Sequence, residues 1–183
     1  MRGFLVAMIA LLCIGCTPEP APAPETKVTP PQKQETPAVQ ITGNPSRIHQ
    51  TADMKVVELG VGGRQIKAWV ADTESARREG MMFLTDEEVP PEHGMIFAFP
   101  AMQKDDGARG FWMQNTILPL DIIYIGADKR VVSAGKGVPF SEETVPPEGD
   151  YRYVLELKQG TAAKLGIKKG TAIEIPASLK TDQ

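Results

Sequence analysis

Four side chains that are able to bind or transform a ligand lie within one short stretch of the sequence. They are Trp112, Asn115, Thr116 and Asp121. An indole ring stacks on a planar ring or a sugar, a carboxamide donates and accepts hydrogen bonds, and a carboxylate acts as a base or an acceptor. In an extended segment, alternation places Trp112 on the face opposite Asn115. This stretch is therefore the first candidate for a ligand-binding site.

Two charged residues elsewhere in the chain complete the candidate site. Glu156 supplies a second carboxylate, and Arg77 supplies a cation that would hold an acidic group of a ligand. We predict a shallow cleft with these two residues at its edge, because loops carried on rigid strands often present binding residues. The walls and the lid of the cleft are expected to come from Trp112, Asn115, Asp121 and the polar loop 103–110.

Two further interpretations of these residues stay open. In the first they are structural: the indole belongs to the core, the polar groups at 115–116 satisfy a turn, and the carboxylates pair with Arg77 or accept from main-chain donors. In the second, Asp121 and Glu156 are the paired carboxylates of a hydrolase or a glycan-processing enzyme. That enzyme would need about 5–10 Å between its two carboxyl groups across an open cleft.

Other catalytic patterns are missing from the sequence. No serine lies in a G-x-S-x-G motif, and the histidines, His49 and His93, do not form HExxH or another paired-ligand spacing. The methionines are dispersed through apolar segments, which is typical of core residues rather than of Cu(I) ligands. We therefore expect no metal and no cofactor, and we favour a non-catalytic domain.

The first residues of the chain predict export. Arg2 precedes an apolar stretch, residues 4–15, which is shorter than the roughly 20 residues that span a bilayer and which fits the hydrophobic region of a signal peptide. Residues 13–16, Cys-Ile-Gly-Cys, resemble the bacterial lipobox, in which the last cysteine receives the lipid. We expect residues 1–15 to be removed as a lipoprotein signal peptide and Cys16 to be acylated, for example with palmitate.

Lipidation at Cys16 implies a location and a set of partners. Thr17 follows the cysteine where an aspartate would favour retention in the inner membrane of enterobacteria. We expect an exported protein anchored to the cell membrane, on the periplasmic face of the outer membrane if the host has two membranes. The chain has 20 basic and 23 acidic residues and a net charge of -3, which argues against nucleic acid as a partner.

Composition divides the remaining chain in two. Eight of the 16 prolines lie between residues 17 and 45, and no aromatic residue occurs between Phe4 and Trp69. Such a stretch buries too little apolar surface to offset the entropy of ordering. Residues 16–50 are thus expected to form a lipidated, disordered, proline-rich tether, and residues 51–183 a globular domain.

Within the domain, local signals predict short elements. Alternating apolar residues at 57–61 and 66–70 flank Gly62 and Gly63, which predicts a hairpin with Leu59 opposite Ile66. Asp72 and Thr73 are expected to cap a helix over residues 74–79 that ends at Gly80. Strands are further expected at 94–99, 111–116, 120–125, 131–132, 151–157 and 172–175, with one helical turn at 162–165.

The spacing of these elements predicts the fold class. Short strands about every ten residues with little helix are typical of an α+β domain that is mostly β. We expect a compact single domain of short antiparallel strands, barrel-like, with one or two short helices. Residues 111–121 are expected to lie beside residues 151–156, because both stretches alternate and neither has a partner nearby in the sequence.

Four stretches of the domain carry more identity than periodicity explains. They are Arg77–Phe83 (RREGMMF), Gly94–Phe99 (GMIFAF), Phe111–Ile122 (FWMQNTILPLDI) and Tyr151–Gly160 (YRYVLELKQG). In this order they resemble the domain of unknown function 192 family, whose pattern runs R-x-x-G-L-M-F, G-M-L-F-x-F, F-W-M-K-N-T-x-x-P-L-D-I and Y-x-x-V-L-E-x-x-x-G. The resemblance covers about residues 55–176. It implies a small β-rich α+β fold and frequent export, with no established reaction.

Taken together, these observations favour a membrane-anchored lipoprotein. Its domain is expected to bind a small molecule, an envelope polymer or a protein partner. The alternative is the hydrolase or glycan-processing enzyme that uses Asp121 and Glu156. A structural or assembly role is a third interpretation, and it would show an exposed apolar patch without a pocket.

Overall fold

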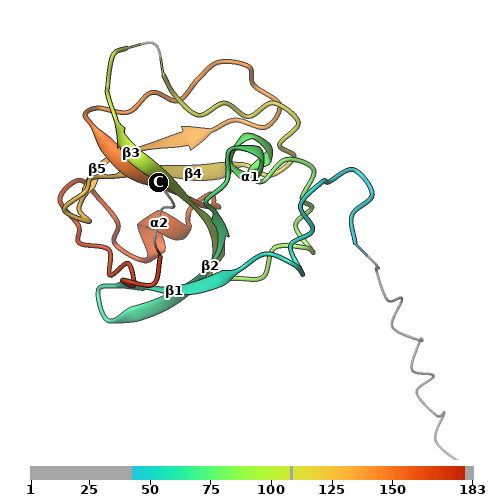
Figure 1. Cartoon of the computed structure of the whole chain (residues 1–183), viewed down its shortest axis with the longest axis horizontal. Coiled ribbons are helices and arrows are strands. Elements are labelled where there is room, and N and C mark those ends of the chain that lie inside the picture. The colour runs from blue at the N-terminus through green and yellow to red at the C-terminus, as the bar shows by residue number, and fades with distance from the viewer. Residues whose placement is uncertain (1–42, 108, 180–183) are drawn as a thin grey trace, which may run out of the picture. The chain divides into compact units, whose positions relative to one another are not determined.

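The computed structural model describes residues 43–107 and 109–179, so the expected signal peptide, Cys16 and most of the expected tether lie outside the described residues. The described residues form six strands and two short helices, and Figure 1 shows how they are arranged. They are β1 (Val56–Val61), β2 (Arg64–Ala71), α1 (Glu74–Glu79), β3 (His93–Gln103), β4 (Leu120–Ile125), β5 (Val131–Gly137), β6 (Tyr151–Lys158) and α2 (Thr161–Lys164). None of the helices in this part of the chain is long and apolar enough to cross a membrane.

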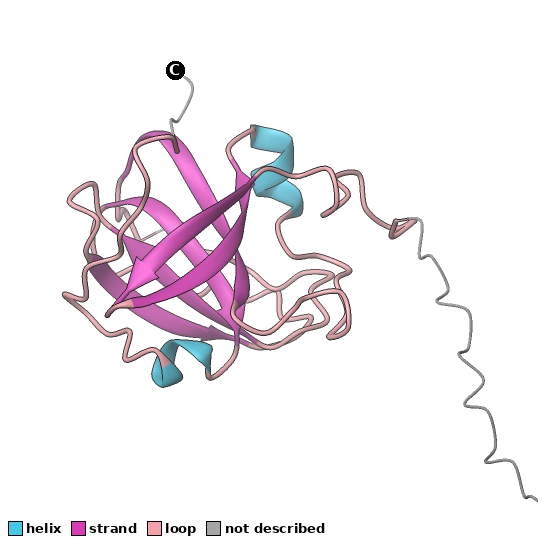
Figure 2. Cartoon of the chain, turned by 90° about the horizontal axis from the view of Figure 1, so that it is seen from below, coloured by secondary structure: helices cyan, strands magenta, loops and turns pink. Residues whose placement is uncertain are grey.

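The strands form one mixed sheet in the order β1-β2-β3-β6-β4-β5. Neighbouring strands are antiparallel except β2 and β3, which are parallel because the chain crosses over through α1 and the loop that follows it. The expected class, α+β and mostly β with two short helices, is confirmed. The sheet curves strongly, as Figure 2 shows, but it is not closed into a barrel, and the parallel pair departs from the all-antiparallel arrangement that we expected.

Local sequence signals account for the hairpin and for α1. Leu59 pairs with Ile66 and Val57 with Ala68 around the Gly62–Gly63 turn, as predicted. The hydroxyl of Thr73 accepts a hydrogen bond from the N–H of Ala76 at 3.2 Å, which caps the start of α1. Gly80 ends the helix with φ 52° and ψ −134°, a backbone conformation that residues with a Cβ avoid.

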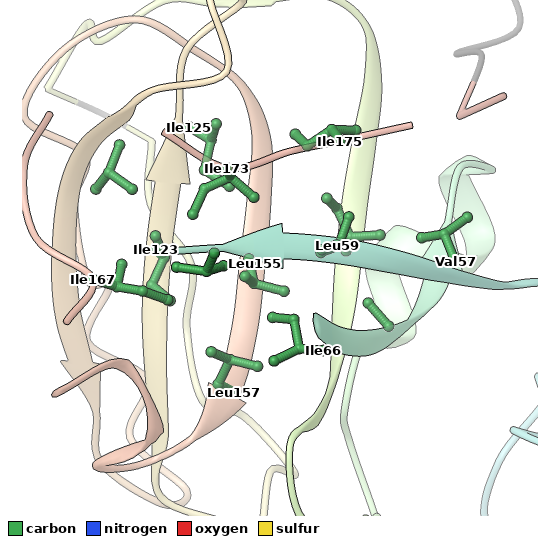
Figure 3. Close-up of a cluster of buried hydrophobic side chains, with 14 of the residues drawn as sticks. Val57, Leu59, Ile66, Ile123, Ile125, Leu155, Leu157, Ile167, Ile173 and Ile175 are labelled. Carbon is green, nitrogen blue, oxygen red and sulfur yellow. The ribbon is translucent and has the colours of Figure 1, made fainter. Parts of the chain in front are cut away.

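Alternation along the strands separates two hydrophobic clusters, one on each face of the sheet. The inner cluster fills the concave side, where Figure 3 shows side chains from β1, β2, β4 and β6 pointing toward one another. Residues of α2 and of the C-terminal segment complete it, among them Ala162, Ile167 and Ile173. The outer cluster includes Met95, Phe97, Ile122, Tyr124 and Val154, and α1 and loops cover it. The two helices accordingly lie on opposite sides of the sheet in Figure 2.

Two expected strands have a different form. The segment 172–175 makes only isolated bridges, from Glu174 to Gly60 and from Ala172 to Arg130. The segment 111–116 is a loop in which only Phe111 makes an isolated bridge, to Val145. Its alternating apolar residues press onto the outer cluster without pairing to a strand. Only Leu120 and the residues after it reach β6, so the expected pairing of 111–121 with 151–156 is wrong over its first part.

Residues 43–50, which we expected in the tether, pack against α1 and the turn after it. Arg47 is buried, and its guanidinium donates to the carbonyl oxygens of Gly80 at 3.0 Å and of Met82. The carboxylate of Glu79 accepts from the N–H groups of Ile48 at 2.6 Å and His49 at 2.8 Å. The segment carries no apolar pattern because polar contacts, rather than hydrophobic burial, hold it in place.

The first prediction concerns Asp121, which is buried and accepts a hydrogen bond from the N–H of Ala162 at 2.9 Å. Asp121→Ala leaves that buried donor at the start of α2 without a partner. We expect the free energy of unfolding in urea to fall by about 1–3 kcal/mol. The control Glu87→Ala changes an exposed loop residue and is expected to stay within about 0.5 kcal/mol of the wild type. Equal stability of the two variants would contradict a structural role for Asp121.

Candidate functional site

Glu156 is the most unusual ionisable residue of the domain. It lies on β6 between Met95 of β3 and Ile122 of β4, and it is 4% exposed. Its Oε2 atom has no hydrogen-bond partner in the structure. Burial disfavours the charged form and raises the pKa of Glu156 from 4.5 to about 8. The side chain is therefore a neutral carboxylic acid at pH 7, and it is able to donate a hydrogen bond.

The lack of a side chain at Gly80 lets Phe97 approach closely beside this carboxyl group. A Cβ at position 80 would lie 3.1 Å from Cζ of Phe97 and 3.8 Å from Oε2 of Glu156. A cavity of about 30 Å³ lies beside the carboxyl group, and Gly80, Thr116 and Trp112 are among the residues that line it. We call it the Glu156 cavity. A volume of this size holds about one or two water-sized groups, such as a hydroxyl or a carbonyl oxygen.

A chain of aromatic contacts forms the wall of the cavity and fixes its position. The ring of Phe111 meets Phe97 edge to face at 4.8 Å and meets Tyr124 at 6.0 Å. The hydroxyl of Tyr124 accepts from the N–H of Phe111 at 3.0 Å and donates to the carbonyl of Val145. Burial raises the pKa of Tyr124, so this hydroxyl keeps its proton. Trp112 follows Phe111 directly, and 45% of it is exposed.

Two larger grooves adjoin the Glu156 cavity and share residues with it. The apolar groove, of about 440 Å³, is bordered by Trp112, Met82, Phe83 and Ile48. The arginine groove, of about 470 Å³, is bordered by Arg77, Arg78, Arg109, Phe99, Phe111 and Tyr151. Trp112 and Met82 belong to both the cavity and the apolar groove, and Arg77 and Phe111 to both the cavity and the arginine groove. The cavity thus lies where the two grooves meet, beside the C-terminal end of α1.

Backbone hydrogen bonds join three loops beside the cavity, and residues with left-handed backbone take part in them. Phe83, Asn115 and Phe140 have φ angles of 63°, 56° and 61°. The N–H of Phe83 donates to the carbonyl of Asn115 at 2.8 Å, and the N–H of Phe140 donates to the carbonyl of Thr116 at 3.1 Å. Such a conformation costs roughly 1–3 kcal/mol for a residue other than glycine and is common at functional sites.

The structure brings together some of the residues that the sequence suggested. Trp112, Arg77 and Glu156 border the same cavity. Asn115 is exposed at the neighbouring turn and does not border the cavity or the two grooves. Of the loop that we expected to form a lid, Arg109 and Gly110 border the arginine groove.

Asp121 does not join this site. In the register of β4 on β6, Asp121 pairs with Leu157 of the inner cluster, whereas Ile122 of the outer cluster pairs with Glu156. The two carboxylates therefore face opposite sides of the sheet. Paired-carboxylate chemistry needs both groups at one cleft, and this arrangement does not supply it.

Several residues that shape the site carry no functional signal in the sequence. Gly80 ends the predicted helix and belongs to the RREGMMF stretch, but neither feature indicates that it lies beside a buried carboxyl. Phe97 and Phe111 lie in stretches that carry the family resemblance, but the sequence assigns them no role in a site, and Ile48 falls within the expected tether. The unusual φ and ψ of Gly80 would be the strongest signal, but a helix-ending glycine does not reveal them.

No metal site accompanies the cavity. Across residues 43–107 and 109–179, no group of three or more His, Cys, Asp or Glu side chains is placed to hold a metal ion. The polar residues that line the cavity are Glu156, Thr116 and three residues at the end of α1, Arg77, Arg78 and Glu79. Such a set binds hydrogen-bonding or anionic groups.

Residues 57–175 match the family model described as DUF192, an uncharacterized ACR. The chain belongs to this family. The DUF192 match includes every strand after the first residue of β1 and the whole of the candidate site apart from Ile48. The DUF192 family brings no assigned reaction, and no curated protein matches the chain.

Two solved structures are similar to this DUF192 domain. A protein of unknown function from Novosphingobium aromaticivorans DSM 12444 is 35% identical, with a TM-score of 0.58 over 70% of this chain and 91% of that one. A protein described as a candidate transcription regulator from Sinorhizobium meliloti 1021 is 31% identical, with a TM-score of 0.57 over 65% of this chain and 91% of that one.

The second prediction tests the neutral state of Glu156. The unfolded chain releases this proton near pH 4.5 and the folded chain near pH 8. Between these values the folded state holds more protons, so the wild type loses stability relative to Glu156→Gln as the pH rises. The difference in free energy of unfolding changes by at most about 1.4 kcal/mol per pH unit.

Urea unfolding at pH 5, 6.5 and 8 measures this difference. Glu58→Gln is the matched control, because Glu58 is exposed on β1. The free energy of unfolding of this variant is expected to differ from that of the wild type by the same amount at all three pH values. A constant difference between the wild type and Glu156→Gln over the whole range would contradict a buried neutral carboxyl.

Proposed function

We propose that this protein is an exported lipoprotein whose DUF192 domain binds a ligand and does not catalyse a reaction. The apolar stretch at 4–15 and the lipobox-like residues 13–16 support export and acylation at Cys16. The absence of a nucleophile motif from the sequence and the opposite faces of Asp121 and Glu156 support binding rather than hydrolysis. The excess of acidic over basic residues supports a partner other than nucleic acid.

A single observation carries the binding proposal. The Oε2 atom of Glu156 is buried without a hydrogen-bond partner among the described residues, and Glu156 borders a cavity that Gly80 also lines. An unsatisfied buried polar group lowers stability by about 1–3 kcal/mol. A ligand oxygen that accepts a hydrogen bond from this carboxyl would recover that energy, and it would do so at a position that no side chain fills.

The residues beside the cavity indicate the chemistry of the rest of the ligand. Trp112 is exposed beside the cavity and offers an indole face on which a sugar or another ring stacks. The apolar groove continues from Trp112 past Met82 and Phe83. The ligand is accordingly a hydroxyl- or carbonyl-bearing molecule with a ring, either free or as a unit of an envelope polymer.

The third prediction distinguishes binding from catalysis at Glu156. Soluble peptidoglycan fragments titrated into the purified protein are expected to raise its melting temperature and to change the fluorescence of Trp112. Glu156→Gln keeps a neutral donor of the same shape, so it is expected to bind within about threefold of the wild type. Glu156→Met removes the donor and is expected to lose roughly 10- to 100-fold in affinity.

Three results would count against this proposal. If no fragment changes the melting temperature or the fluorescence, the domain does not bind this class of ligand. If Glu156→Gln loses as much affinity as Glu156→Met, an ionised carboxylate acts there, as in an enzyme. Turnover of a fragment by the wild type would exclude a purely binding role.

The fourth prediction tests the anchor. Wild-type protein is expected to stay with membranes after a high-salt wash, because acyl chains on Cys16 hold it by hydrophobic insertion. Cys16→Ala removes the acylation site and is expected to release the protein into the soluble fraction or to leave the signal peptide uncleaved. A cleaved Cys16→Ala protein that still sediments with washed membranes would show that another feature anchors it.

A further inference from the structure

The arginine groove differs in charge from the rest of the domain. Three of its bordering residues are arginines, Arg77, Arg78 and Arg109, and one is a carboxylate, Glu74, in a chain with a net charge of -3. We infer that the ligand of this domain carries an anionic group, a carboxylate or a phosphate, which binds at Arg77. This inference rests on the proposed ligand binding at the Glu156 cavity and names the class of ligand.

Arg77 is a pre-organised cation. Its Nη1 atom donates to the carbonyl oxygens of Asp72 and Ala98, the latter at 2.9 Å, and its guanidinium lies 5.2 Å from the centre of the Phe99 ring. These contacts hold the guanidinium in one place. Its hydrogen bonds with described residues use Nη1 alone, and no ion pair between described residues includes Arg77. The other nitrogens of the fork remain for an external anion.

The other two arginines have carboxylate partners that an anionic ligand is able to replace. Arg78 pairs with Glu74 at 2.8 Å, and both side chains are largely exposed. Arg109 lies 3.4 Å from the carboxylate of Asp106. Exposed pairs of this kind contribute roughly 0–1 kcal/mol. Exchanging such a partner for a ligand anion therefore lowers stability little. The two exposed arginines then add their positive charge to that of Arg77 at the anion.

Aromatic walls limit the class of anion. Phe99 meets Tyr151 edge to face at 5.7 Å, and Phe111 borders both the arginine groove and the Glu156 cavity. A bare inorganic anion would leave these rings uncovered. The lining fits a carboxylate or phosphate attached to a ring body, such as an acidic sugar or a sugar phosphate, whose oxygen reaches the carboxyl of Glu156.

Matched pairs of sugars test this inference. N-acetylmuramic acid and N-acetylglucosamine share a ring and an acetamido group but differ in the lactyl ether that carries a carboxylate, and glucose 6-phosphate and glucose differ in a phosphate. Titrations followed by calorimetry or by the Trp112 indole signal are expected to show at least tenfold tighter binding of one acidic sugar than of its neutral partner. The acid that binds tighter identifies carboxylate or phosphate as the source.

Variants assign the effect to the arginine groove. Arg77→Gln is expected to reduce the affinity for the acidic sugar at least tenfold, to the level of its neutral partner. Arg64→Gln is the matched control, because it removes the same charge from an exposed residue of β2 outside the grooves. Since Arg77 also joins α1 to β3, the double variant Arg78→Gln/Arg109→Gln provides a second measurement that leaves those contacts intact. It is expected to weaken acidic binding about threefold or more.

The outcomes separate this inference from the proposed function. Equal affinity for acidic and neutral sugars, with both weakened by Glu156→Met, would overturn the anion inference and leave the proposed function standing. The anion inference also fails if Arg64→Gln weakens acidic binding as much as Arg77→Gln does. Long-range attraction by the basic residues of the whole domain, rather than a contact with Arg77, would then explain the preference. If none of the four sugars binds, both proposals fail for this class of ligand.

Discussion

Burial of the sheet on both faces is the constraint on which the rest of this structure depends. All six residues of β4 are buried, yet the two helices have only six and four residues. Helices of this length cannot cover a sheet, so loops cover most of the outer face. A buried loop carries peptide groups without a strand or helix partner, and each of them needs one. The hydroxyl of Tyr124, the guanidinium of Arg47 and the carbonyl of Asn115 supply such partners.

The candidate site is the place where this loop cover is incomplete. Tyr124 and Glu156 lie on neighbouring strands and face the same side of the sheet. The hydroxyl of Tyr124 has a donor and an acceptor partner in the loops, whereas Oε2 of Glu156 has none. Gly80 lies beside this carboxyl and has no side chain that could offer it a hydrogen bond. The loops that cover the outer cluster thus also bury the Glu156 carboxyl group. A ligand would supply the hydrogen-bond partner that these loops do not.

The sequence predicted the elements whose signals are local. The Gly62–Gly63 turn and the alternation beside it are enough to set the register of β1 on β2, and Thr73 and Gly80 mark both ends of α1. The strand prediction for 111–116 failed because alternating apolar residues suit a loop pressed onto a sheet as well as a strand. The deciding feature is the left-handed backbone at Asn115, whose carbonyl binds a turn more than thirty residues earlier in the chain. A single sequence carries no signal for that contact.

Strand register explains why only part of the site was predictable. Asp121 and Glu156 both occur in alternating apolar strands, and neither strand by itself tells which face its carboxylate takes. The register of β4 on β6 sends Asp121 to the inner face and Glu156 to the outer one. On the inner face the first carboxylate meets the N–H of Ala162 at the start of α2 and is satisfied. On the outer face the second borders the end of α1, Phe97 and the covering loops, and its Oε2 has no hydrogen-bond partner among the described residues. Residue types identify carboxylates that are able to do chemistry, but a long-range strand pair decides which one becomes structural.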